Sequence, residues 1–202
     1  ETVADPLDSV AVLRDSGRFV TIDHLGEDVT DRAAAEVTVQ AYLQLLDALG
    51  RLGAAHADPR PLEVSLKLSA LGQALPQHGE KIARGAAEII CARAAEIGVG
   101  VTVDAEDHTT TDSTLSIVRD LRDDFPWLGT VLQAYLKRTE GDCREFAASG
   151  ARIRLCKGAY DEPAAVAFRD PDAVTANYLR CLRVLMAGDG YPMVASHDPA
   201  VI

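Results

Sequence analysis

The chain has 202 residues, 48% of them hydrophobic, and a formal net charge of −11. This length and composition suffice for one well-buried domain and exclude a disordered or fibrous chain. The excess of acidic groups repels phosphate backbones and argues against nucleic-acid binding, and no apolar run is long enough to span a membrane. The four cysteines, Cys91, Cys143, Cys156 and Cys181, are widely spaced, which favours reduced thiols in a cytoplasmic protein.

Six short runs rich in β-branched residues alternate along the chain with longer segments of helical periodicity. The runs are RFVTIDHLG from Arg18, LEVSLKLSA from Leu62, VGVTVDAED from Val99, GTVLQAYLK from Gly129, ARIRLCKGAY from Ala151 and YPMVASHD from Tyr191. Alternation of this kind without hairpin turns predicts parallel strands joined by helical crossovers.

Three of the intervening helices have recognisable ends. The first begins at a cap, Thr30 or Asp31, and ends at Gly53. Its apolar stripe is predicted to consist of Val37, Ala41, Leu45, Leu49 and Leu52. The second helix carries an apolar set of Ile82, Ala86, Ile89, Ile90 and Ile97, and ends at Gly98. The third begins with Asp170 before Pro171, a cap followed by proline at the first helical position.

Alternation within the strands distinguishes a closed barrel from an open sheet. In VSLKLS, Val64 and Leu66 face one side, whereas Ser65 and Lys67 face the other, and VTVDAED and RIRLCK alternate in the same way. Strands of an open sheet between two helical layers should be apolar on both faces. One apolar face under helices and one polar face toward a lumen suit a barrel. The sequence therefore predicts an α/β fold, a TIM-type (β/α)8 barrel.

The predicted barrel is partial. A barrel of this type has eight strands and typically about 250 residues. Six strands are predicted here, in a single domain over residues 1–202, and the chain ends shortly after the sixth, at DPAVI. We therefore expect about six of the eight strand–helix units, with the chain incomplete at its C-terminus.

Polar and charged residues follow each predicted strand, where barrel enzymes carry their catalytic groups. They are Asp23, His24, Lys67, Asp104, Glu106, Gln133, Lys137, Arg138, Arg154, Lys157, Ser196, His197 and Asp198. Charges that follow apolar runs are partly desolvated and need partners, so an internal ion-pair network, such as Lys67 with Asp104, is one interpretation. Their recurrence at six strand ends favours the other, an active site.

The residues alone leave the chemistry of that site open. The chain has no GxGxxG after its first strand and no GxxxxGK[ST], which excludes the standard nucleotide cradles. A divalent ion held by Asp104, Glu106, His108 and His197 is disfavoured, because no HxxxH or HxH spacing is present. Lys157 at a strand end could form a Schiff base, as in barrel aldolases.

Five motifs, and a sixth that precedes them, give the chain a family resemblance. VSLKLSALG, VTVDAED, VLQAYLKR, RIRLCKGAY and ASHD, in this order and spacing, and TIDHLGEDVT before them, resemble the proline dehydrogenase family. Asp161 after GAY stands where bifunctional members usually carry tryptophan, which favours the monofunctional branch. The resemblance implies a flavoprotein on a distorted β/α barrel. Such an enzyme uses FAD to oxidise L-proline to Δ1-pyrroline-5-carboxylate and passes the electrons to a membrane quinone.

The resemblance also assigns roles to residues. It makes Asp104 and Arg154 catalytic, and it makes Lys67 and Tyr160 substrate-binding, with Lys67 facing the proline carboxylate. It assigns cofactor binding to Ala105, Gln133, Cys156, Lys157, Gly158, Ala159, Ser196 and His197, and it implies no metal. We expect a cytoplasmic protein, peripheral on the inner face of the membrane. Hydroxyproline as substrate, a Schiff-base aldolase using Lys157, and an inactive barrel fragment stay open as alternatives.

Overall fold

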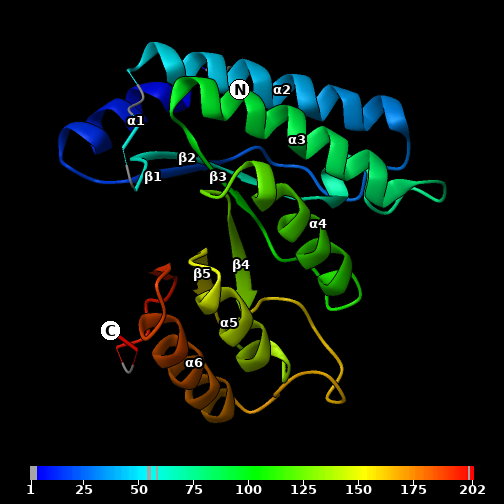
Figure 1. Ribbon diagram of the computed structural model, residues 1–202, viewed down its shortest axis with the longest axis vertical. Helices are drawn as coiled ribbons and strands as arrows, with labels where there is room; N and C mark the ends of the chain where they lie inside the picture. The colour runs from blue at the N-terminus through cyan, green and yellow to red at the C-terminus, as the bar shows by residue number, and fades with distance from the viewer. Residues whose placement is uncertain (1–3, 54–55, 58, 200) are drawn as a thin grey trace. The chain divides into compact units, whose positions relative to one another are not determined.

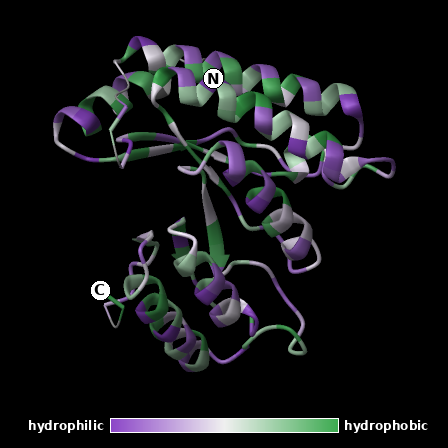
Figure 2. Cartoon of the chain, in the orientation of Figure 1, coloured by the Kyte–Doolittle hydropathy of each residue, from purple (hydrophilic) through white to green (hydrophobic). Residues whose placement is uncertain are grey.

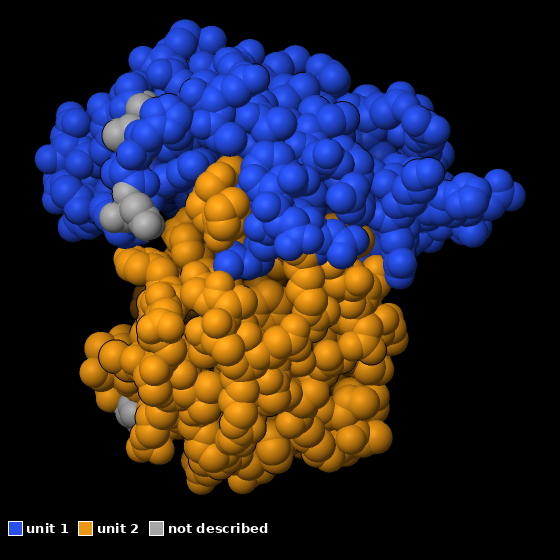
Figure 3. Space-filling view, in the orientation of Figure 1, with its two compact units in different colours: residues 1–104, 120–125 blue, residues 105–119, 126–202 orange. Residues whose placement is uncertain are grey.

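A computed structural model describes residues 4–53, 56–57, 59–199 and 201–202. They form two compact units, shown in two colours in Figure 3. The N-terminal unit comprises residues 1–104 and 120–125, and the C-terminal unit comprises residues 105–119 and 126–202. The described residues contain six strands, at the positions that the sequence predicts. None of the described helices combines the length and the apolar character needed to cross a bilayer.

The N-terminal unit contains three parallel strands. They are β1 (Val20–Asp23), β2 (Leu62–Leu66) and β3 (Gly100–Val103), with Asp23 opposite Ser65 and Leu66 opposite Val103 in register. Its helices are α1 (Ala4–Asp15), α2 (Arg32–Arg51) and α3 (Gly79–Ile97), with a short 3-10 helix, η1 (Ser69–Leu71). Helices α2 and α3 lie side by side (Figure 1).

The C-terminal unit repeats this arrangement. Its parallel strands are β4 (Gly129–Gln133), β5 (Arg152–Cys156) and β6 (Tyr191–Val194), with Gln133 opposite Cys156 and Leu155 opposite Val194. Helices α5 (Thr139–Ala148) and α6 (Pro171–Met186) pack against each other (Figure 1). Helix α4 (Thr111–Asp124) is divided between the two units at residue 120.

The predicted caps at Asp31, Gly98 and Asp170 are confirmed, whereas α2 ends at Arg51, two residues before the predicted Gly53. Asp31 caps α2, because its side chain accepts a hydrogen bond from the Ala34 N–H. Gly98 ends α3 in the left-handed conformation, which glycine adopts without steric cost. Asp170 caps α6, with proline in its first turn.

The predicted apolar stripe of α2 is wrong at its first position. Val37 is 69% exposed, whereas the face that α2 buries contains Ala35, Val39, Tyr42, Leu46 and Leu49. Steps of four residues turn a helix by about 400°, so a strict i+4 series drifts around the axis. The buried face alternates steps of three and four instead. Ile89 of α3 is also exposed, because it lies outside the face that α3 buries with Ala83, Ala87, Ile90 and Ala94. Figure 2 shows hydrophobic and hydrophilic residues around these two helices.

The polar sides of the strands are buried together with the apolar sides. Ser65, Thr102 and Thr130 are as inaccessible as their apolar neighbours. Strand β6 differs, because Tyr191 and Val194 are exposed. Buried polar residues meet solvent at the strand ends, and a functional site is therefore expected there.

Candidate functional site

Lys67 and Asp104 lie level with each other at the carboxyl end of the N-terminal unit's strands. Each is the first residue after its strand, β2 or β3, and the two strands end in register. The Asp104 N–H donates to the Leu66 carbonyl at 2.7 Å, which extends the ladder to this edge. Local strand pairing thus brings a cation and a carboxylate to the same edge.

The direct partner of Lys67 is Asp23, the last residue of β1. Lys67 Nζ lies 2.7 Å from Asp23 Oδ2 and 3.8 Å from Glu27 Oε1. The ion pair with Asp104 that the sequence suggested is therefore wrong. Burial acts to lower the pKa of Lys67, but the hydrogen bond and charge of Asp23, with further attraction from Asp104 and Glu27, raise it overall. Lys67 is thus a charged group with only 16% of its side chain exposed.

Asp104 is fixed from the neighbouring strand. Its Oδ1 accepts a hydrogen bond from Ser65 Oγ at 2.9 Å. The hydroxyl of Tyr42, from α2, donates to the Ser65 carbonyl at 2.6 Å. Burial, and then the charge of Asp23, raise the pKa of Tyr42, with a smaller contribution from Asp104, so the phenol stays protonated. The Ser65 hydroxyl, a neutral donor, therefore helps to orient Asp104, whose charge acts on Lys67.

In the C-terminal unit, Gln133 ends β4 with a buried and unsatisfied side chain. The residue is 4% exposed, and none of the described residues donates a hydrogen bond to its Oε1. Its backbone carbonyl, by contrast, accepts from Thr139 Oγ1 at 2.6 Å. Burying an acceptor without a donor costs free energy. A ligand bound beside Gln133 would therefore be favoured if it donated an N–H or O–H to Oε1.

The segment after β5 passes close to Tyr135. Gly158 has a φ of +111°, and a Cβ there would lie 2.3 Å from ring atoms of Tyr135, so only glycine fits. Tyr160 is half-buried against the apolar cluster of Tyr135, Leu136 and Ala167. Lys157, Gly158 and Tyr160 together line a cavity of about 360 Å³, while the neighbouring Ala159 is exposed.

Lys157 also reaches the residues that follow β6. Its Nζ lies 2.6 Å from Asp198 Oδ2 and donates to Thr175 Oγ1 at 3.0 Å. Ser196 Oγ accepts from the Asp198 N–H at 3.1 Å. Lys157, Ser196 and His197 line a second hollow of about 540 Å³. Lys157 therefore lines both of these hollows.

The remaining predicted site residues of this unit occupy strand and loop positions. Arg154 is half-buried within β5, opposite Val131 on one side and Met193 on the other. Cys156 ends β5, is half-buried and forms no disulfide with any described residue. Ala105, also half-buried, follows the end of β3 directly. That Lys67 and Asp104 converge with these residues on one cavity stays a prediction.

Two strand-end residues have structural contacts. Arg138 forms ion pairs with Asp112 and Asp142, which raise its pKa despite burial. Lys137 donates to the carbonyls of Ala164 and Ala165. These two side chains hold helices and loops in place.

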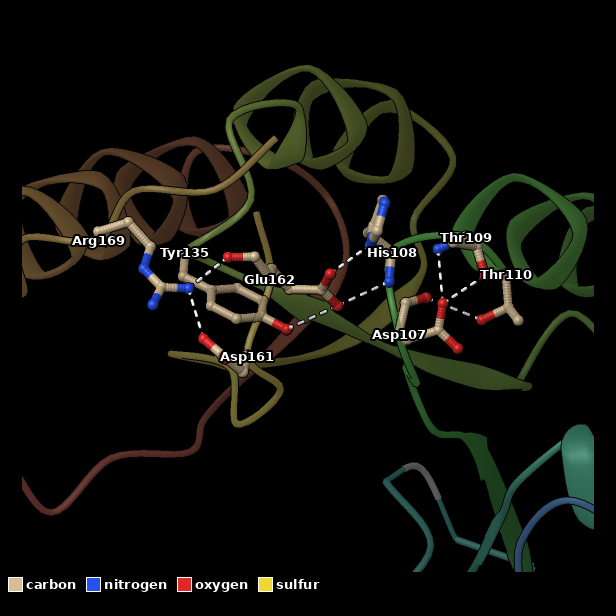
Figure 4. A network of polar contacts seen from close by, with 8 residues as sticks. All are labelled: Asp107, His108, Thr109, Thr110, Tyr135, Asp161, Glu162 and Arg169. Carbon is tan, nitrogen blue, oxygen red and sulfur yellow. Dashed lines mark hydrogen bonds and ion pairs between the residues drawn. The ribbon is translucent and has the colours of Figure 1, made fainter. Parts of the chain in front are cut away.

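Glu162 is the residue that sequence reasoning missed. It is 3% exposed and accepts hydrogen bonds from the His108 N–H and the Tyr135 hydroxyl (Figure 4). Its neighbour Asp161 is exposed and pairs with Arg169. The available signal was an acidic residue directly after the GAY motif, but nothing in the spacing shows which of two adjacent acids turns inward.

Comparison with known proteins decides the family. The family described as proline dehydrogenase matches residues 7–200. The chain belongs to the proline dehydrogenase family. It is 35% identical to the proline dehydrogenase of Deinococcus radiodurans and 34% identical to proline dehydrogenase 1 of Bacillus subtilis, over 100% of this chain in both cases. It spans 64% of the length of each of these relatives.

Solved structures confirm the β/α-barrel fold class. Proline utilization A (PutA) from Bdellovibrio bacteriovorus, inactivated by N-propargylglycine, matches with a TM-score of 0.83 at 25% identity. The match covers 98% of this chain and 25% of that one. PutA from Bradyrhizobium japonicum matches with a TM-score of 0.78 at 24% identity, which supports the fold alone. The predicted resemblance of the five motifs to the proline dehydrogenase family is thus confirmed.

Proposed function

We propose that this chain is the barrel portion of an FAD-dependent proline dehydrogenase that oxidises L-proline to Δ1-pyrroline-5-carboxylate and passes the electrons to a quinone. The observation that carries the proposal is Lys67, a half-buried cation held at a strand end in a member of this family. Access to a membrane quinone would require the cytoplasmic protein to associate peripherally with the inner face of the membrane.

Lys67 suits the carboxylate of a small zwitterion. Its ammonium is kept charged by Asp23, and a partly desolvated ammonium binds a carboxylate more strongly than a solvated one does. Tyr160 offers an aromatic wall, half-buried against Tyr135, for the apolar ring carbons of proline. Charge at one end and an apolar wall at the other match the chemistry of this substrate.

Asp104 and Arg154 are the proposed catalytic residues. The proline nitrogen has to lose its proton before hydride leaves the neighbouring carbon. The Asp104 carboxylate, which accepts a hydrogen bond from Ser65, is the group proposed to face that nitrogen and accept its proton. Arg154 supplies a fixed positive charge within β5, which would stabilise the negative charge that develops on the electron acceptor.

The residues proposed for FAD have features that fit a flavin. The buried Gln133 Oε1 has no donor among the described residues, and a flavin ring carries an N–H that could supply one. Lys157 offers positive charge to a phosphate, and Ser196 and His197 offer polar groups in the same hollow. Ala105, Cys156, Gly158 and Ala159 complete the proposed set. When bound, FAD would supply the two-electron acceptor that amine oxidation requires.

The aldolase alternative is weakened by the contacts of Lys157. A Schiff base needs a neutral lysine amine, whereas Lys157 Nζ forms an ion pair with Asp198 at 2.6 Å. Its hydrogen bond to Thr175 holds the side chain further in place. Lys157 is better suited to binding an anion than to attacking a carbonyl.

A direct test uses the purified protein with its cofactor. We expect a yellow preparation whose flavin absorbance is bleached by L-proline under anaerobic conditions and restored by a quinone. The product should react with o-aminobenzaldehyde, which traps cyclic imines. Borohydride in the presence of carbonyl substrates should leave the protein mass unchanged. A colourless protein that borohydride labels at Lys157 would overturn the proposal in favour of the aldolase.

A further inference from the structure

The buried carboxylate of Glu162 joins two loops of the C-terminal unit. Glu162 Oε1 accepts from the backbone N–H of His108 at 2.8 Å, and Oε2 contacts His108 Nδ1. The Tyr135 hydroxyl lies 3.4 Å from Oε1. In the imidazole tautomer that carries its proton on Nδ1, His108 donates both its backbone and its ring N–H to this carboxylate. Figure 4 shows the carboxylate between the two rings.

The His108 side of this contact is fixed locally. Asp107 Oδ1 accepts from the Thr109 N–H at 2.7 Å, and the Asp107 carbonyl accepts from Thr110 Oγ1 at 2.9 Å. These bonds form a tight turn between β3 and α4, and the turn aims both the N–H and the ring of His108 at Glu162 (Figure 4). The loop after β3 therefore offers a preformed pair of donors.

The Glu162 side belongs to the segment that lines the cavity at Tyr160. The Glu162 N–H donates to the Tyr160 carbonyl at 3.0 Å, and Arg169 Nη1 bonds both Asp161 and the Glu162 carbonyl. Tyr135 is held within the same segment, since its N–H donates to the Lys157 carbonyl and its carbonyl accepts from Phe168, both at 2.8 Å. A shift of Glu162 would therefore move the cavity wall.

We infer that Glu162 is a positioning residue: it anchors segment 157–169 to the loop after β3 and thereby fixes where Tyr160 stands. Its carboxylate touches neither substrate nor cofactor in this assignment. It acts through the backbone it holds, because a single residue separates it from Tyr160 and one hydrogen bond joins their main chains. The substrate role of the Tyr160 wall rests on the function proposed above.

The test compares two carboxylate-to-amide variants of the holoenzyme. Glu162→Gln keeps the shape but cannot accept from both His108 donors as a carboxylate does. We expect it to raise the KM for proline about tenfold while kcat changes little, as for a misplaced binding wall. Glu145→Gln removes an exposed ion pair with Arg119 in the same unit and is the matched control, with KM and kcat unchanged. His108→Ala should reproduce the rise in KM, and the double variant should add nothing further.

Hydrogen exchange provides a readout that does not depend on the substrate. In Glu162→Gln and His108→Ala, the amides of His108 and Phe168 should exchange faster than in the wild type, and in Glu145→Gln they should not. A folded variant that loses only melting temperature, with KM and exchange unchanged, overturns the inference. If Glu162→Gln does not fold, His108→Ala decides by the same criteria. If the wild type does not oxidise proline, the proposed function fails and exchange alone decides this inference.

Discussion

Lys67 Nζ lies 2.7 Å from Asp23 Oδ2, so the cation of β2 is held by the carboxylate that ends β1. The register of the strands produces this pair, because Asp23 is opposite Ser65, two residues before Lys67. Asp104 remains near Lys67 without pairing with it directly, and it raises the pKa of the lysine through its charge. Asp23 therefore positions the lysine, while Asp104 adds negative charge beside it and accepts a hydrogen bond from Ser65.

Replacing Lys67 with methionine tests the carboxylate assignment. In the holoenzyme, Lys67→Met should leave FAD bound and raise the KM for proline about ten- to a hundredfold, because a charge-assisted contact contributes about 1.5–3 kcal/mol. Steady-state kinetics and the flavin spectrum check both parts. Arg154→Met should instead slow flavin reduction or weaken flavin binding. An unchanged proline KM with a large loss of melting temperature would show that Lys67 serves only an internal ion pair.

The pH dependence of substrate binding should report the Lys67–Asp23 pair. A raised pKa keeps the ammonium charged up to and beyond its ordinary value of 10.5, so carboxylate binding is lost only as the pH rises through the raised pKa. Asp23→Asn removes the largest of the influences that raise the pKa, so that burial, which lowers it, is opposed only by Asp104 and Glu27. Binding in the variant should therefore fail at a lower pH than in the wild type.

The measurement uses a proline analogue with oxygen in place of the ring nitrogen, because proline's own amine titrates in the same range. Its dissociation constant is followed against pH for both proteins. If the wild type and Asp23→Asn lose affinity for the analogue over the same alkaline pH range, the role given to Asp23 is contradicted.

Gln133→Met tests whether the Gln133 amide serves FAD binding or the stability of the fold. The buried Oε1 has no donor among the described residues, so replacing the amide by an apolar chain of similar size should leave the cofactor-free protein as stable or more so. The same change should weaken FAD retention, read by dialysis and by flavin fluorescence. A variant that binds FAD like the wild type but unfolds at lower temperature would give Gln133 a structural role.

Gly158→Ala should destabilise the C-terminal unit. Alanine is strained at a φ of +111°, and its Cβ would lie 2.3 Å from the Tyr135 ring, so we expect a loss of about 2–4 kcal/mol. Gly85→Ala is the control, because nothing lies within 4 Å of a Cβ there and α3 should gain about 0.5–1 kcal/mol. Denaturant unfolding measures both. Equal stability of the two variants would contradict the close approach of Gly158 to Tyr135.

The sequence by itself determined the strands, the helix ends and the family. Strand VSLKLS and helix caps such as Asp31 and Asp170 are local features, in which a few neighbouring residues decide the conformation. Positions after strand ends could be identified as candidate site positions for the same reason. The family was also recognisable from the sequence, because its motifs occur in the same order and spacing along nearly the whole chain.

Only the tertiary structure decided which of these residues meet. Lys67 has three acids within reach of its charge, and strand register selected Asp23 as its direct partner over Asp104. Asp161 and Glu162 are adjacent acids, yet one is exposed and the other is buried beneath His108 and Tyr135. Such choices depend on contacts between residues 44 and 54 positions apart in the chain. Side-chain pairing across such separations is set by packing of whole elements, which local sequence patterns do not encode.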